Sequence, residues 1–177
     1  MFRVLFVCTG NTCRSPMAVA IYEKKSREYG ISSSCSSAAL GFISDSGVSK
    51  NAQLVCNEIG LDLSKHVPRP IRERDVEVAD VFVCMTDNHA ETLMMLGIPK
   101  DKIYVLGGGV PDPYGSDLAT YRRCRKFIEE SIDEFAGYSR KRSTTVHSKQ
   151  RKLREREHDK SDDCKDGERA FGGCCRA

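Results

Sequence analysis

The sequence predicts an α/β domain with a parallel sheet that is covered by helices on both faces. Short apolar runs alternate with longer amphipathic segments through residues 2–137, and this order of strand, helix, strand, helix is typical of a parallel sheet. The first apolar run ends in a turn with the sequence CTGNTCRS. Because the ligand sites of such folds lie beyond the carboxyl ends of the strands, this turn is the first candidate for a functional site.

Apolar runs predict three of the four strands. The first, FRVLFV, is apolar almost throughout, as expected for a strand with both faces buried. ADVFVCM and KIYVL again read as buried strands, and we expect a further short strand around Ser33 to Ala38, although this stretch is mostly serine. The four strands are expected at residues 2–7, 33–38, 79–85 and 102–106.

Four segments with a period of 3.6 residues predict the helices. They are expected at residues 16–30, 49–60, 87–96 and 116–135. For the first helix we expect Ser15 as the N-cap, Pro16 at the first helical position and Gly30 at the end. We expect Asp87 to begin the third helix.

Charge divides the chain into two regions. Residues 1–138 carry 16 Lys and Arg against 18 Asp and Glu, whereas residues 139–177 carry 12 against 7. The second region has few apolar residues. Burying them would gain too little free energy to offset the conformational entropy that is lost when the chain becomes ordered. We therefore expect one domain over residues 1–138 and a basic, disordered tail over residues 139–177. Interspersed acidic residues and the scarcity of aromatic side chains argue against a nucleic-acid-binding arm.

The composition favours a cytoplasmic protein. No segment approaches the ~18 apolar residues that a membrane helix needs, and the apolar start is too short for a secretory signal. The nine cysteines are an odd number with irregular spacing, unlike a secreted disulfide framework. We expect a monomer or weak dimer that has no contact with membranes.

The turn after the first strand has the residues of a phosphate-binding site with a nucleophile. Cys8 opens the turn and Arg14 closes it, in the spacing C-x5-R-S. Successive backbone N–H groups of such a turn converge on one point, to which the following helix adds the positive end of its dipole. This cup would stabilise a thiolate at Cys8, and the planar guanidinium of Arg14 suits two phosphate oxygens.

The other residues of the turn fit the same role. Thr9 and Gly10 let the backbone turn closely, while Asn11 and Ser15 can hydrogen-bond across the loop. A Walker-type nucleotide loop is excluded because the Gly-Lys-Ser/Thr ending is missing. A zinc site on the two cysteines of the turn lacks nearby ligands of matching spacing.

A thiolate that attacks phosphorus also needs an acid to protonate the leaving atom. The segment GGGVPDPYGSD, residues 107–117, places Asp112 between two prolines, with glycines on both sides that allow movement. Asp112 could protonate the leaving atom and then, as a carboxylate, activate the water that hydrolyses the phosphocysteine. Asp-Pro alone is usually only a turn, but together with CTGNTCRS it predicts a two-part catalytic site.

The motif pair VCTGNTCRSPMA and DPYG resembles the low-molecular-weight protein tyrosine phosphatase family over roughly residues 2–137. Weaker matches are DLSKH, ADVFVCMT and SAA. The last departs from the family pattern at Ala39, where the family usually has glycine. The resemblance implies a Rossmann-like three-layer sandwich with a four-stranded parallel sheet and a phosphate-binding loop after the first strand. It also implies a protein phosphatase without metal or cofactor, acting on phosphorylated proteins.

The resemblance assigns roles to individual residues. Cys8 is the expected nucleophile, Arg14 the phosphate ligand and Asp112 the general acid. Loop-organising roles are implied for Asn11, Ser15 and His66, although His66 could equally be a surface histidine.

Cys13 has two interpretations. It could fill space under the loop, or, by resemblance to the family, it could form a reversible disulfide with Cys8 that protects the nucleophile from irreversible oxidation. We favour the redox role, because a reactive thiolate beside a second thiol fits the pattern of a redox sensor.

The substrate class depends on Thr12. Typical tyrosine-specific members carry a bulky aliphatic residue here, whereas threonine is shorter and offers a hydroxyl to a guanidinium. The sequence CTGNTCRS is similar to that of the bacterial protein arginine phosphatase subgroup, so we favour phosphoarginine, with phosphotyrosine as the alternative. Tyr114 supports the alternative, because an aromatic side chain after Asp-Pro can flank a phosphotyrosine ring, and Thr12 could also be a neutral substitution.

Two other classes remain open. Thioredoxin-coupled arsenate reductases are similar in this fold and opening loop, but they need two further cysteines. Cys84 is one candidate, and residues 85–95 contain no partner for it. A catalytically silent phosphate-binding module is the non-enzyme alternative, which the intact set of Cys8, Arg14 and Asp112 opposes.

Overall fold

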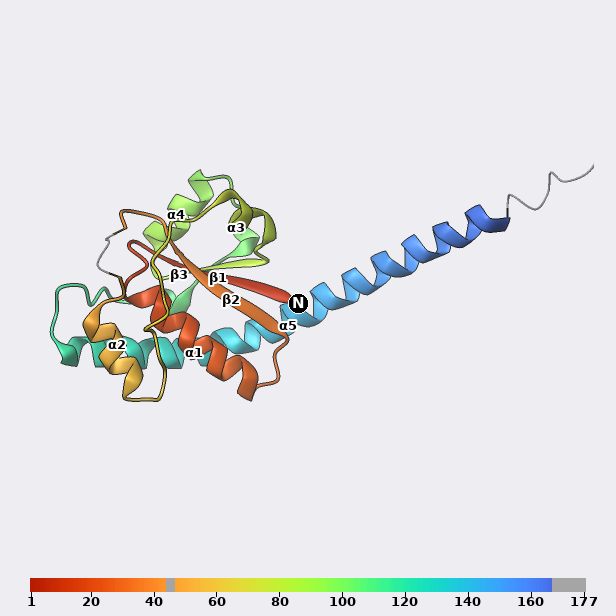
Figure 1. Ribbon diagram of the computed structural model, residues 1–177. Coiled ribbons are helices and arrows are strands. Elements are labelled where there is room, and N and C mark those ends of the chain that lie inside the picture. Colours follow the sequence, from red (N-terminus) through yellow and green to blue (C-terminus); the bar gives the residue numbers. More distant parts are fainter. Residues whose placement is uncertain (44–46, 167–177) are drawn as a thin grey trace, which may run out of the picture.

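The computed structural model describes residues 1–43 and 47–166, and it confirms the predicted α/β class. A parallel sheet of four strands forms the centre, in the order β2-β1-β3-β4. The strands are β1 (Phe2–Cys8), β2 (Ser33–Ala39), β3 (Val81–Cys84) and β4 (Ile103–Val105). Helices lie on both faces of the sheet (Figure 1), so the three-layer sandwich that the resemblance implied is confirmed.

A separate group of helices covers each face of the sheet. They are α1 (Arg14–Glu28), α2 (Lys50–Asn57), α3 (Glu73–Val78), α4 (Asp87–Met95) and α5 (Leu118–Asp166), with 3₁₀ turns η1 (Lys100–Lys102) and η2 (Leu106–Gly108). One buried cluster joins α1, α2 and α5 to the sheet, and the other joins α3 and α4 to it. Val4 and Phe6 of β1 belong to the first cluster, Leu5 and Val7 to the second. This alternation explains why the first strand is apolar on both faces.

The second strand ends one residue later than predicted, at Ala39. The N–H of Ala39 donates to the carbonyl of Arg69 at 2.8 Å, and the N–H of Ile71 donates to the carbonyl of Ala39 at 3.0 Å. Asn11 is the only residue other than glycine with a positive φ in the described part of the chain. The φ of Ala39 is therefore negative, as is usual for alanine. Alanine in place of the family's glycine therefore fits this strand end without strain.

The start of α1 differs from the prediction. The helix begins at Arg14, with Cys13 at the N-cap and no side-chain cap hydrogen bond. Ser15 therefore lies inside the first turn, and the prediction that it caps the helix was wrong. Its hydroxyl faces the loop instead, 2.9 Å from the sulfur of Cys8. The helix α4, by contrast, begins at Asp87 as predicted. Thr86 is its N-cap, and the Thr86 hydroxyl accepts a hydrogen bond from the backbone N–H of His89.

The last helix crosses the boundary that the composition suggested. It runs from Leu118 to Asp166 and extends beyond the rest of the domain (Figure 1). Ser139 and Ser143 are buried, and the hydroxyl of Ser143 donates to the carbonyl of Ser32 at 3.1 Å. The helix thus continues past residue 138, where the composition suggested the end of the domain. Residues 167–177 of the expected tail lie outside the described part of the chain.

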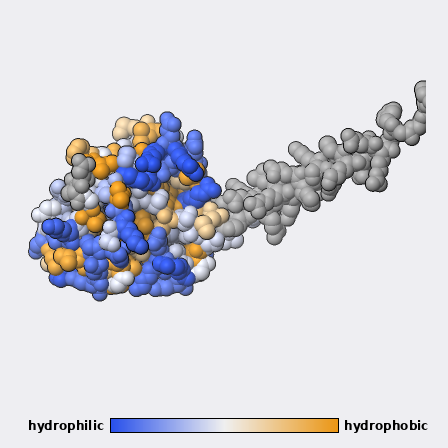
Figure 2. Space-filling view, viewed as in Figure 1, coloured by the Kyte–Doolittle hydropathy of each residue, from blue (hydrophilic) through white to orange (hydrophobic). Residues whose placement is uncertain are grey.

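Hydrophilic side chains cover most of the face shown in Figure 2, with smaller hydrophobic patches between them. Within residues 1–43 and 47–166, none of the helices is both long and apolar enough to cross a membrane.

Candidate active site

The loop between β1 and α1 forms a cup around the sulfur of Cys8. Cys8 ends β1 and is buried, and the loop then returns within five residues to Arg14, where α1 begins. The backbone N–H of Asn11 donates to Sγ of Cys8 at 3.2 Å, and the hydroxyl of Ser15 lies 2.9 Å from the same sulfur. The positive end of the α1 dipole lies at this loop. The arrangement suits a thiolate and, beside it, an anion.

Asn11 holds the shape of the cup. It is fully buried and has a φ of 55°, a conformation that asparagine tolerates better than most residues. Its side-chain amide donates to Ser15 Oγ at 2.8 Å, and its side-chain oxygen accepts the backbone N–H of Arg69 at 3.2 Å. Its carbonyl accepts a hydrogen bond from Nε2 of His66 at 2.9 Å. The loop is thus tied to a segment more than fifty residues away in the chain.

His66 therefore contacts the loop directly and does not lie free on the surface. Because a carbonyl oxygen only accepts, the contact with Asn11 places the ring proton on Nε2. Burial lowers the pKa of His66, while the hydrogen bond to Asn11 opposes that shift and the charge of Arg69 adds to it. The neutral ring is the form that supports the loop at pH 7.

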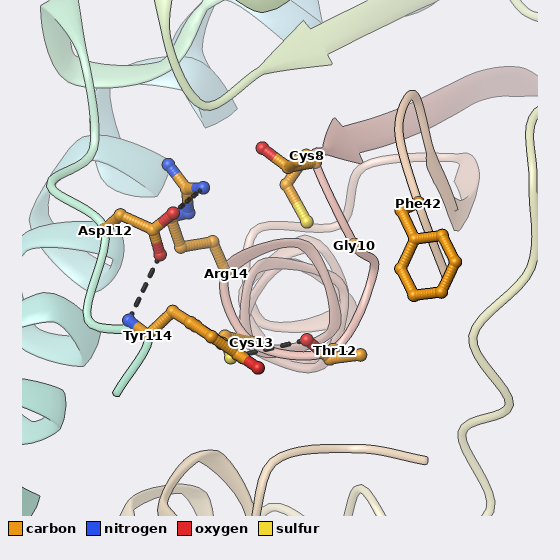
Figure 3. Close-up of a pocket in the computed structure, with 9 residues that line it drawn as sticks. Cys8, Gly10, Thr12, Cys13, Arg14, Phe42, Asp112 and Tyr114 are labelled. Carbon is orange, nitrogen blue, oxygen red and sulfur yellow. Dashed lines mark hydrogen bonds and ion pairs between the residues drawn. The ribbon is translucent and has the colours of Figure 1, made fainter. Parts of the chain in front are cut away.

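Arg14 and Asp112 meet across the mouth of the cup. Nη2 of Arg14 lies 2.5 Å from Oδ2 of Asp112, and its Nη1 donates to the carbonyl of Val110 at 3.4 Å. The side chain of Arg14 is 5% exposed and that of Asp112 is 49% exposed. The other carboxylate oxygen of Asp112 accepts the backbone N–H of Tyr114 at 3.2 Å (Figure 3). The acid is thus held in place yet reachable from solvent.

A cavity of about 360 Å³ opens beside these groups. Its walls come from the loop after β1, the segment after β2 and the segment around Asp112, and Figure 3 shows the side chains around it. The lining residues are Cys8, Thr9, Gly10, Thr12, Cys13, Arg14, Phe42, Asp112 and Tyr114. Thr12 and Tyr114, the two residues suggested for substrate selectivity, are in this set, whereas Asn11 and Ser15 of the loop are fully buried and are not.

Phe42 is a residue of this cavity that the sequence analysis missed. Its side chain is 87% exposed, although it is large and apolar, and Tyr114 is 75% exposed. Together they give the mouth of the cavity two aromatic side chains. The available signal was an apolar residue just after the second predicted strand, at the edge of the sheet where ligands bind.

Cys13 lies on the buried side of the loop. Its sulfur is 3.3 Å from the hydroxyl of Tyr121 and 3.5 Å from that of Thr12. The hydroxyl of Ser49 donates to Tyr121 at 3.0 Å, and burial raises the pKa of Tyr121 to about 12. Cys8 and Cys13 are both buried free thiols. Within the described residues, no group of three or more His, Cys, Asp or Glu side chains is arranged to hold a metal ion.

His89 is a second residue that the sequence analysis missed. It is 8% exposed and lies in the first turn of α4, with Nε2 3.0 Å from the hydroxyl of Thr9. Burial, together with the positive charge of Arg14, lowers the pKa of His89 to about 4, against a smaller opposite effect of Asp112. Its position after β3 was the signal, because the carboxyl ends of β1 and β3 meet at one edge.

Comparison with known proteins identifies the family. The family model described as low molecular weight phosphotyrosine protein phosphatase matches residues 3–152. The chain belongs to this family. It thus belongs among the protein phosphatases that use a cysteine for catalysis.

The relatives of this phosphatase chain include enzymes with different named substrates. A protein-arginine-phosphatase of Geobacillus stearothermophilus is 33% identical over 143 residues, covering 76% of this chain and 94% of the relative. The human low molecular weight phosphotyrosine protein phosphatase is 32% identical over 150 residues, covering 72% and 94%. The crystal structure of a YwlE mutant from Bacillus subtilis superposes with a TM-score of 0.73 at 31% identity, covering 78% of this chain and 98% of that one.

Proposed function

We propose that this phosphatase hydrolyses phosphoarginine in proteins through a phosphocysteine at Cys8. The observation that carries the proposal is the convergence of Cys8, Arg14 and Asp112 on one cavity, with an ion pair of 2.5 Å between the last two. Cys8 and Arg14 stand at the two ends of one loop and Asp112 comes from a distant segment, and together they supply a nucleophile, a fixed cation and an acid.

The reaction takes two steps. In the first, the substrate's phosphate displaces Asp112 from Arg14, and the carboxylate, which is open to solvent, takes up a proton. The thiolate of Cys8 then attacks phosphorus, the bond between phosphorus and the guanidinium nitrogen breaks, and Asp112 gives its proton to that nitrogen. Arg14 and the N–H groups of the loop stabilise the negative charge on the equatorial oxygens. In the second step, Asp112 takes a proton from water, which attacks phosphorus and releases phosphate and the free thiolate.

The choice of phosphoarginine depends on Thr12. This side chain lines the cavity, and its hydroxyl can accept a hydrogen bond from a guanidinium. Relatives named protein-arginine-phosphatase support the same choice. Phosphotyrosine is the second candidate, because Phe42 and Tyr114 give the mouth of the cavity two aromatic side chains that could flank a phosphoaryl ring.

A direct test compares matched peptides that carry phosphoarginine or phosphotyrosine at the same position. We expect the reduced protein to have the higher kcat/KM for phosphoarginine, and Cys8→Ser, as the blank, to release no phosphate from either. A higher kcat/KM for phosphotyrosine would replace the substrate assignment and leave the mechanism standing. Phosphate release by Cys8→Ser equal to that of the wild type would contradict the mechanism itself.

The arsenate reductase alternative is opposed by the state of Cys84. This thiol is fully buried in β3, and burial raises its pKa to about 12, so that it is a poor thiolate. A silent binding module is opposed by the complete set of reactive groups. Release of para-nitrophenol from para-nitrophenyl phosphate would exclude such a module.

For the setting in which the enzyme works, we propose a cytoplasmic monomer or weak dimer whose basic C-terminal segment makes no contact with nucleic acid. The charge pattern of that segment supports this, since acidic residues are interspersed among the basic ones. Sedimentation of the full chain, alone and with a duplex DNA, tests both parts. A complex with the duplex at physiological salt would overturn the second.

A further inference from the structure

A histidine from α4 reaches the phosphate-binding loop through the hydroxyl of Thr9. Nε2 of His89 is 3.0 Å from Oγ1 of Thr9. On the other side of the ring, Nδ1 is 2.9 Å from Oγ1 of Thr86. The same Thr86 oxygen accepts the backbone N–H of His89 at 3.4 Å. The imidazole is therefore held at both nitrogens between a helix cap and the loop that carries Cys8.

The ring is neutral at pH 7, so one of its two nitrogens carries a proton. Burial and the charge of Arg14 lower the pKa of His89 to about 4, and the ring is 8% exposed. One nitrogen must then donate a hydrogen bond and the other must accept one. Two arrangements are possible, and they differ in where the protons of the two threonine hydroxyls point.

The partners of Thr86 decide between the arrangements. If Nδ1 carried the proton, the Thr86 oxygen would accept from both Nδ1 and the backbone N–H of His89, and its own proton would have no hydrogen bond to any described residue. If Nε2 carries the proton, the hydroxyl of Thr86 donates to Nδ1 and every group between the two threonines is satisfied. The hydroxyl of Thr9 then accepts from Nε2, and its own proton is free to point elsewhere.

Thr9 lines the cavity beside Cys8, so its hydroxyl proton can point into the cavity. We propose that His89 is a positioning residue, which makes the hydroxyl of Thr9 a hydrogen-bond donor to a phosphate group in the cup. The relay runs from the α4 cap at Thr86 through the ring to Thr9. It deepens the proposed function, on which it rests, by adding a side-chain donor to the backbone N–H groups of the loop.

The position of Thr9 is fixed from a second side, which makes such a donor well directed. The N–H of Gly41 donates to the carbonyl of Thr9 at 2.9 Å. A Cβ added at Gly41 would lie 3.1 Å from the methyl carbon of Thr9, so the two segments are in close contact. The Thr9 side chain is thus restrained at its methyl group by Gly41 and at its oxygen by His89.

The test uses two substitutions of His89 in two backgrounds. In His89→Gln the amide nitrogen replaces Nε2 and still donates to Thr9, whereas His89→Asn is one carbon shorter and does not reach it. Each is made with Thr9 present and in Thr9→Val. The readouts are kcat/KM for para-nitrophenyl phosphate and the dissociation constant of inorganic phosphate, with thermal unfolding as the check on folding.

We expect His89→Asn to weaken phosphate binding and kcat/KM about tenfold in the presence of Thr9, the usual effect of one lost hydrogen bond. In Thr9→Val the same change should have less than a twofold effect, because the donor is already absent. His89→Gln should stay within about threefold of the wild type. Equal losses in both backgrounds would mean that His89 acts on the fold alone, and would overturn the proposal.

If His89→Asn does not fold, a comparison of two Thr9 variants tests the proposal instead. Thr9→Ser keeps the hydroxyl and should bind phosphate like the wild type, whereas Thr9→Val should bind about tenfold more weakly. Equal binding by Thr9→Ser and Thr9→Val would overturn the proposal. Phosphate binding needs no turnover, so a wild-type chain that binds phosphate but hydrolyses neither phosphoarginine nor any phosphoester would refute the proposed function separately.

Discussion

Arg14 and Asp112 form an ion pair across the mouth of the cup, with 2.5 Å between Nη2 and Oδ2. In the proposed mechanism Arg14 binds the phosphate of the substrate and Asp112 is the general acid. When a phosphate group enters, it competes with Asp112 for the guanidinium. We expect Asp112 then to move toward the leaving atom, which the glycines on both sides of its segment would permit.

Replacing Asp112 should affect turnover much more than binding. We expect Asp112→Asn to lower kcat about 10²- to 10⁴-fold, the usual contribution of a general acid, with KM changed less than threefold. Initial rates on an alkyl phosphate, whose leaving group needs a proton, measure the effect. Asp117→Asn is the matched control, because this exposed carboxylate accepts the backbone N–H of Thr120 outside the cavity. Equal losses in the two variants would rule out the acid role of Asp112.

Two substitutions of Thr12 separate its hydroxyl from its size. Thr12→Ile should shift the ratio of kcat/KM values toward phosphotyrosine about tenfold, because it adds apolar bulk and removes the acceptor for a guanidinium. Thr12→Val keeps the shape of threonine and should lose activity on phosphoarginine without a gain on phosphotyrosine. Matched phosphopeptides give both ratios. An unchanged ratio in Thr12→Ile would leave Thr12 without a role in selectivity.

We expect oxidation of the enzyme to be reversible through Cys13. Hydrogen peroxide converts the Cys8 thiolate to a sulfenic acid, which the thiol of Cys13 can attack to form a disulfide and water. Peroxide should therefore inactivate the wild type, and dithiothreitol should restore most of its activity. Cys13→Ser should recover much less, whereas Cys35→Ser, which changes a thiol near Val19 outside the cup, should recover normally. Full recovery of Cys13→Ser would refute the disulfide.

The low pKa of His89 predicts a loss of stability in mild acid. Burial lowers the pKa of His89 from 6.5 in its ordinary state to about 4 in the folded protein. The unfolded chain therefore binds this proton first, so the stabilisation is complete above pH 6.5 and is lost as the pH falls toward 4. Between pH 7.5 and pH 5 the free energy of unfolding should fall by about 2 kcal/mol from this group. Urea unfolding at the two pH values measures it.

His89→Gln is the reference for that measurement. Carboxylates also titrate in this range, and they contribute equally to both proteins. The acid-induced loss should therefore be about 2 kcal/mol smaller in the variant. The same loss in both proteins would show that His89 is not protected from protonation.

The sequence predicted the parts of this molecule that local patterns determine. The strands β1, β3 and β4 and the helices α1, α2 and α4 follow from apolar patterns, and both halves of the site follow from CTGNTCRS and DPYG. The helix α3 has only six residues, too few to show a period, and it was not predicted. His89 and Phe42 belong to no local motif, since only the topology of the sheet brings them to the cup.

The C-terminal segment shows a different limit of composition arguments. Residues 139–166 have few apolar side chains, yet they continue α5. A helix that has already formed over twenty residues needs no new nucleus, so each further residue adds only the small free energy of propagation. Composition measures how much a segment can bury, and it takes no account of the helix that precedes the segment.

The hydrogen bonds of Asn11 have a consequence for the energetics of binding. Its left-handed backbone is held by hydrogen bonds to Ser15, Arg69 and His66, all of them made between groups of the chain itself. The cup is therefore preorganised, and the entropy of ordering the loop is lost during folding instead of during each encounter with substrate. An oxyanion such as phosphate or vanadate can then bind without losing free energy to order the loop, and it needs no contacts from a leaving group to compensate for such a loss.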